Sequence, residues 1–286
     1  MIYIVGHQQV ENLDKLNKNY TYLNTTELCK TNPDDIILQC HKFLNEWIAQ
    51  YYIRNYTQLD DNEIYGFCHY RRVFDYQDIQ YNSIINDNKV QMFQHCIHFM
   101  PKPVYLTLKI DKIQDYQLVY VYIVKQLGSL PMYNFFVEYM NTFPLDIQNK
   151  WKEKTKFYGV EKPGRIDSTP YCPFKPCPSR EIFVMNKQNL IEMTDFLTGY
   201  VKYIFQKLEI NSLNKANLIF YNVYSYNLVD QNSIDDHYRW FCSRESRLIA
   251  YILELLVGLY IYVNYETIYK SIWPNNFMNS MTEFMD

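Results

Sequence analysis

The chain has 286 residues, of which 48% are hydrophobic and 17% aromatic, so it can bury a substantial core and is not a disordered protein. Its length corresponds to one large domain or two small ones. The 28 Lys and Arg residues stand against 31 Asp and Glu residues, and the formal net charge of −3 excludes a global basic field for binding nucleic acid. We therefore expect any site for a polyanion to be local.

The cysteine pattern and the first residues indicate a reducing, cytoplasmic compartment. The seven cysteines lack the spacing of a disulfide framework, and the first segment lacks the charged and apolar regions of a signal peptide. One apolar stretch, 248–263, has only 16 residues and contains Glu254, whereas a membrane span requires about 20 apolar residues. We expect it to be a buried core helix that runs into a strand, and we expect no transmembrane segment.

Strands and helices are predicted to alternate in the first third of the chain. Residues 2–5 predict a short strand that ends at a turn, 39–56 predict a helix with one wide apolar stripe, and 63–69 predict a second strand. This alternation is typical of an α/β fold, with a mainly parallel sheet and helices on both faces.

The rest of the chain is predicted to be mainly helical. In chain order we expect a strand at 96–100, helices at 113–127 and 132–141, a proline-dense loop at 156–180, a strand at 182–185, and helices at 187–208 and 234–256. A loop of this length inside a compact domain is more often a binding loop or a lid than a connector.

The most informative segment is 66–74, which reads GFCHYRRVF and ends a predicted buried strand with three cationic side chains: His69, Arg71 and Arg72. Ligands of open parallel sheets bind beyond the carboxyl ends of the strands, and the forked guanidinium group suits a phosphate. The cluster therefore indicates a phosphate or diphosphate site. In the alternative interpretation, the two arginines pair with Asp75 or Asp78 and only stabilise a turn.

This segment resembles the signature of a GT-A-type glycosyltransferase family, long known as a domain of unknown function and found in loci for capsular and exopolysaccharide synthesis. The family pattern is approximately xELTAxYWIWKN and, after a spacer, GLCHYRRYF; residues 45–55 and 66–74 are similar to its two parts. Three more segments, 2–7, 181–187 and 247–256, are similar in the same order to IYVVTHK, NMFIMKK and RVFGYLAERLL. The CHYRR part is fairly specific, whereas the other matches count only through their order.

The resemblance implies one GT-A-like, Rossmann-like domain over residues 1–265, with a donor side at about 1–105, an acceptor side at about 106–265 and a C-terminal tail at 266–286. Such a domain transfers a sugar from a nucleoside-diphosphate donor, a UDP- or GDP-sugar, to a hydroxyl of a glycan or glycoconjugate. Departures from the family pattern occur at Gly6, Trp47, Ile48, Glu181 and Leu255. The losses of the family's Thr and Asn among them bear on the choice of sugar and acceptor.

Many GT-A enzymes hold Mn²⁺ or Mg²⁺ on the diphosphate with an Asp-x-Asp motif, but the comparable strand end here reads His-Tyr-Arg-Arg. The departing diphosphate gains negative charge that must be stabilised. We therefore expect His69, Arg71 and Arg72 to supply the positive charge, with no metal required. Asp75 and Asp78 are the candidate ligands should Mn²⁺ or Mg²⁺ bind.

The resemblance gives candidates for the nucleotide site, and the start of the last predicted helix gives candidates for the base. His7 and Tyr3 are the nucleotide-binding candidates, because His7 directly follows the first strand; Tyr3 is alternatively a core residue of that strand. Asp235 and Asp236 are candidates for the base that an inverting transfer needs, although a carboxylate at the start of a helix is alternatively an N-cap.

Glu46, Arg247 and Glu254 are candidates for supporting roles. Glu46 is expected to bond to an arginine at the strand tip, whereas Arg247 and Glu254 match the family but are alternatively a pair of buried charges. Because the chain has no Asp-x-Asp motif and no clear base, the alternative function is a non-catalytic nucleotide-sugar-binding or glycan-binding protein. An aromatic-rich structural subunit would explain the composition but not the clustered cations.

Overall fold

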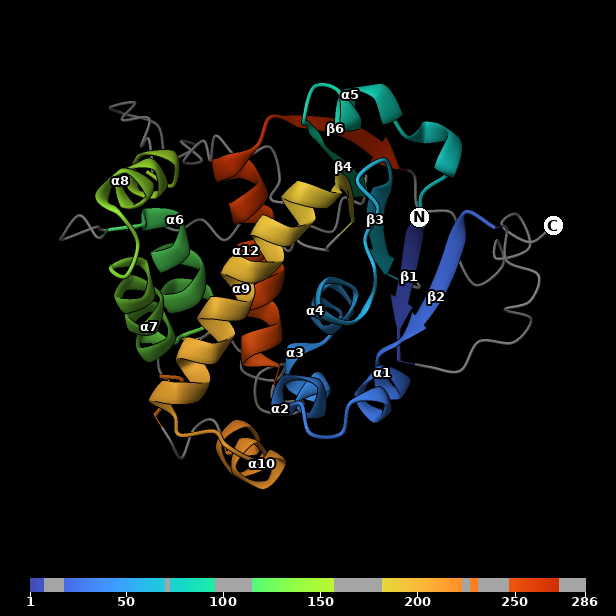
Figure 1. Cartoon of the computed structure of the whole chain (residues 1–286). Helices are drawn as coiled ribbons and strands as arrows, with labels where there is room; N and C mark the ends of the chain where they lie inside the picture. Colours follow the sequence, from blue (N-terminus) through green and yellow to red (C-terminus); the bar gives the residue numbers. More distant parts are fainter. Residues whose placement is uncertain are drawn as a thin grey trace.

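A six-stranded sheet forms the centre of the protein (Figure 1). The structure, a computed structural model, describes residues 1–7, 18–69, 73–95, 115–156, 182–222, 227–230 and 247–272. The strands of the sheet are β1 (Ile2–Gly6), β2 (Tyr20–Asn24), β3 (Ile64–His69), β4 (Val90–His95), β5 (Phe183–Asn186) and β6 (Thr267–Ile272).

The strand order is β2-β1-β3-β5-β4-β6. Strand β1 pairs in parallel with β2 and β3, and β4 pairs in parallel with β6, whereas β5 runs antiparallel to both β3 and β4. The expected α/β class with a mainly parallel sheet is confirmed.

Helices make up most of the remaining described chain and dominate its second half, as expected. They are α1 (Thr25–Thr31), α2 (Ile36–Gln39), α3 (His41–Leu44), α4 (Trp47–Tyr56), α5 (Tyr81–Ile85), α6 (Gln117–Tyr120), α7 (Leu130–Met140), α8 (Leu145–Lys154), α9 (Lys187–Lys207), α10 (Leu213–Tyr221) and α12 (Leu248–Asn264). A 3₁₀ turn, η2 (Tyr76–Asp78), precedes α5, and a π-helical turn, η3 (Val121–Gln126), continues α6.

Alternating side chains give the sheet two buried faces. One face, which includes Val5 and Phe67, shares a large hydrophobic cluster with α3, α4, α9 and α12. The other face, which includes Ile2 and Cys68, packs against a smaller cluster that contains Phe74 and residues of α5. Helices therefore cover both faces, and the two clusters hold β1 and β3 in the middle of the molecule.

The helix expected at 39–56 is wrong in its continuity. The chain forms three short helices there, α2, α3 and α4, which are interrupted at Cys40 and Asn45. Asn45 has φ of 54°, in the left-handed region that no α-helix interior adopts, so the chain changes direction between α3 and α4. The apolar stripe is mostly buried as expected, because its residues face the core from α3 and α4.

The C-terminal boundary of the domain also requires correction. Strand β6 pairs with β4 from Thr267 to Ile272, so the sheet extends beyond residue 265 and a tail beginning at 266 is wrong. Helix α12 continues to Asn264 instead of ending at Leu256, and the apolar stretch 248–263 is helical throughout. Within the described ranges, no helix combines the length and the apolar composition that crossing a bilayer requires.

Three predictions fall on parts of the chain that the structure does not describe. These are the strand at 96–100, nearly all of the proline-dense loop at 156–180 and the first part of the helix at 234–256.

Candidate functional site

The order of the strands reverses at β1. The chain passes from β1 to β2 on one side and then crosses to β3 on the other side of β1. In open α/β sheets such a switch point opens a crevice beyond the carboxyl ends of the two strands, where ligands bind. Val5 is the register partner of His69, so the carboxyl ends of β1 and β3 lie side by side (Figure 1).

A histidine stands at each of these two strand ends. His7 directly follows β1 and is exposed, and His69 is the last residue of β3, with a side chain that is 20% exposed. The structure thus places these two predicted site residues at neighbouring strand ends. Arg71 and Arg72 lie outside the described residues.

Glu46 lies against His69 from the start of α4. Its Oε1 atom is 3.1 Å from Nε2 of His69, and its side chain is 18% exposed. Glu46 occupies the N-cap position of α4 but makes no side-chain capping bond, because its carboxylate is directed to the imidazole instead. Such a contact fixes the orientation of the imidazole ring. The predicted partner of Glu46 was an arginine, and the partner that the structure shows is this histidine.

Tyr3 packs as a strand residue of the sheet. Its ring contacts Phe67, its register partner on β3, with 5.4 Å between the ring centroids. Burial raises the pKa of Tyr3 to about 12, so the phenol is neutral at physiological pH. This placement matches the alternative interpretation of Tyr3 as a core residue.

The two candidate metal ligands each have a partner within the protein. Asp75 caps η2 by accepting a hydrogen bond of 2.9 Å from the backbone N–H of Gln77. The carboxylate of Asp78 pairs with the ammonium group of Lys270 on β6. Over the part of the chain that the structure describes, no group of three or more His, Cys, Asp or Glu side chains is arranged to hold a metal ion.

The remaining candidates are only partly described. Asp235 and Asp236 lie outside the described residues. Arg247 precedes the first turn of α12 and Glu254 lies within that helix, both half-buried. Seven residues separate them, which is about 10 Å along the helix axis.

The comparisons with known proteins give one structural likeness. No protein-family model matches the sequence, and no curated protein matches it. Among solved structures, the chain is similar to the apo structure of the WbbM bifunctional glycosyltransferase, with 16% identity and a TM-score of 0.39. The alignment covers 96% of this chain and 45% of that one, so the chain spans less than half of its length. A likeness of this size carries no argument about function, and the α/β class rests on the sheet itself.

Proposed function

We propose that the protein is a GT-A-like glycosyltransferase that transfers a sugar from a UDP- or GDP-sugar to a hydroxyl of a glycan or glycoconjugate. The observation that carries this proposal is the pair of histidines at the topological switch point, His7 after β1 and His69 at the end of β3. Arg71 and Arg72 follow His69 in the sequence by two and three positions. A cationic edge of this kind suits the diphosphate of a sugar donor.

The transfer breaks the bond between the anomeric carbon of the sugar and the β-phosphate oxygen, which keeps the electron pair. In the proposal, His69, Arg71 and Arg72 stabilise the negative charge that accumulates on the leaving diphosphate. Glu46 holds the imidazole of His69 in place through the 3.1 Å contact, so the ring is oriented before the donor binds.

The acceptor hydroxyl must lose its proton as it attacks. We assign this step to a carboxylate, with Asp235 and Asp236 as the candidates, because a positioned carboxylate is an ordinary general base. No step is assigned to a metal ion, since Asp75 and Asp78 are engaged by Gln77 and Lys270. Polysaccharide synthesis in the cytoplasm is the proposed setting, which rests on the sequence resemblance.

The experiment is to incubate the pure protein with a panel of nucleotide sugars and to follow slow hydrolysis of the donor, which needs no acceptor. We expect hydrolysis of a UDP- or GDP-sugar that persists in excess EDTA and is not increased by Mn²⁺. Strict dependence on Mn²⁺ would contradict the metal-independent mechanism. Binding without hydrolysis or transfer would favour a non-catalytic binding protein, and the absence of any nucleotide binding would refute the proposal.

A further inference from the structure

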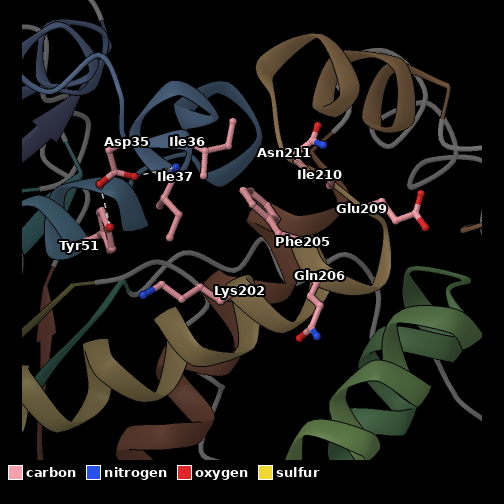
Figure 2. Close-up of a pocket in the computed structure, with 10 residues that line it drawn as sticks. All are labelled: Asp35, Ile36, Ile37, Tyr51, Lys202, Phe205, Gln206, Glu209, Ile210 and Asn211. Carbon is pink, nitrogen blue, oxygen red and sulfur yellow. Dashed lines mark hydrogen bonds between the residues drawn. The ribbon is translucent and has the colours of Figure 1, made fainter.

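A second concave feature lies outside the switch point residues. A pocket of about 450 Å³ is formed between Asp35 at the start of α2, Tyr51 of α4 and the C-terminal end of α9 (Figure 2). This volume lies within the range of small-molecule pockets in proteins. None of the residues that line this pocket was predicted from the sequence to belong to a functional site.

One wall of the pocket presents fixed hydrogen-bond acceptors. Asp35 Oδ1 accepts a bond of 2.8 Å from the backbone N–H of Ile37, and Oδ2 accepts bonds from the hydroxyls of Tyr51 at 2.8 Å and Tyr56 at 2.5 Å. Of the two tyrosines only Tyr51 lines the pocket; it has donated its only hydroxyl proton to Asp35, so its oxygen is left with lone pairs that accept. Burial raises the pKa of Tyr51 well above its ordinary value, so this hydroxyl stays neutral.

The opposite wall presents donors. Lys202 and Gln206 stand one turn apart on α9, and Asn211 follows the end of that helix (Figure 2). Their side chains are exposed, and none of the three makes a hydrogen bond or ion pair with the residues that the structure describes. The ammonium group of Lys202, whose side chain extends toward Tyr51, therefore has donors available for a ligand, whereas the amides of Gln206 and Asn211 point to opposite sides (Figure 2).

The floor between the walls is apolar. It is formed by Phe205 of α9, with isoleucines from α2 and from the segment after α9. The charged groups around the pocket are the carboxylates of Asp35 and Glu209 and the ammonium of Lys202, so negative charge exceeds positive charge. This balance disfavours a diphosphate, whose own charges would face two carboxylates.

We propose that this pocket binds one sugar ring of a glycan. Sugar hydroxyls both donate and accept hydrogen bonds, and a sugar ring has an apolar C–H face, so a neutral sugar matches the acceptor wall, the donor wall and the floor together. The choice of a glycan chain as the source of that sugar rests on the proposed function, in which a glycan is the acceptor.

The position of the pocket agrees with such a role. Tyr51 and Glu46 both follow the interruption of the helices at Asn45. Tyr51 lies five residues after Glu46, and this separation corresponds to about 7.5 Å along the axis of α4. The pocket therefore adjoins the helix whose N-cap residue, Glu46, contacts His69. A sugar bound here belongs to the acceptor chain at a position beyond the one that reacts.

The test uses the full-length protein and a panel of di- and trisaccharides of glucose, galactose, mannose and rhamnose, with binding followed by NMR titration. The variants are Tyr51→Phe, which removes one hydroxyl, and Lys202→Ala, which removes the ammonium group. The matched control is Tyr203→Phe, because the Tyr203 hydroxyl also donates to a carboxylate, that of Glu138 at 2.8 Å, but lies outside the pocket.

We expect the wild type to bind at least one saccharide, each pocket variant to weaken that binding about three- to tenfold, and the control to leave it unchanged. Binding of UDP or GDP, measured on the same samples, should not change in any variant. Failure of every saccharide to bind, or equal affinity in the wild type and both pocket variants, overturns the inference. Nucleotide binding without saccharide binding refutes only the assignment of the pocket to a sugar. Saccharide binding without nucleotide binding refutes the proposed function and leaves that assignment standing.

Discussion

Replacing Gly66 with alanine tests the close approach of β1 and β3 on which the switch point depends. A Cβ atom at this position would overlap Cδ1 of Ile2 and would lie 3.1 Å from Cγ2 of Val184 and 3.2 Å from Cζ of Phe74. Ile2, Val184 and Phe74 are 0%, 0% and 1% exposed, so none has free space into which it can move. Overpacking of this kind costs about 1–3 kcal/mol.

The alanine also brings a gain, because a glycine in a strand costs roughly 0.5–1 kcal/mol of chain entropy. The difference predicts that Gly66→Ala lowers the free energy of unfolding by about 1 kcal/mol, measured by urea denaturation. Ile2→Val removes the overlapping methyl group and alone costs about 0.5–1.5 kcal/mol.

In the double variant the new methyl group takes the vacated space, so the two costs should be less than additive by about 1 kcal/mol. The matched control is Ile210→Val, a buried isoleucine of the other hydrophobic cluster, whose cost should add to that of Gly66→Ala. Simple additivity for Gly66→Ala with Ile2→Val, or a stabilising effect of Gly66→Ala alone, would refute the described packing.

Three further predictions concern single contacts. A double-mutant cycle of Glu46→Ala and His69→Ala in urea denaturation should give a coupling of about 1–2 kcal/mol, since both side chains are mostly buried, and a coupling near zero would contradict their contact. Glu209 has φ of 53° after α9, so Glu209→Gly should raise the free energy of unfolding by about 1 kcal/mol. Lys202→Gly, inside the helix, should lower that free energy by roughly 0.5–1 kcal/mol. Changes of the same sign in both variants would contradict the left-handed conformation of Glu209. Because burial raises the pKa of Tyr3 from 10.0 to about 12, the folded protein keeps a phenol proton between pH 10 and 12 that the unfolded chain loses. The free energy of unfolding should therefore fall as the pH rises from 10 to 12, and it should fall less in Tyr3→Phe. An equal fall in the wild type and in Tyr3→Phe would show that the phenol is exposed.

Much of the fold could be predicted because its central elements carry strong apolar signals. Strands β1 and β3 and helix α9 are deeply buried and appear as apolar runs or stripes. Strand β2 was missed, since it lies at the edge of the sheet and most of its residues are only half-buried. The break at Asn45 was also missed, because a single left-handed residue leaves the hydrophobic period almost unchanged.

The candidate site could be predicted only where it follows the order of the chain. His69 was placed at a strand end because it ends a buried run, but its partner Glu46 comes from an element 23 positions earlier. The sequence predicted that Glu46 lies near the strand tip, but it did not predict that its partner there is His69 and not an arginine. The pocket of Asp35 and Lys202 was not predictable, because only the packing of α4 against α9 brings those segments together.

The most direct test of the cationic switch point is calorimetric titration of UDP and GDP into the wild type and Arg71→Ala. The matched control is Arg54→Ala, because Arg54 pairs with Asp195 at 3.1 Å on an exposed surface. The account predicts that Arg71→Ala weakens diphosphate binding by about 1.5–3 kcal/mol, the range of charge-assisted hydrogen bonds, while the control binds as the wild type does. An unchanged dissociation constant in Arg71→Ala would contradict it.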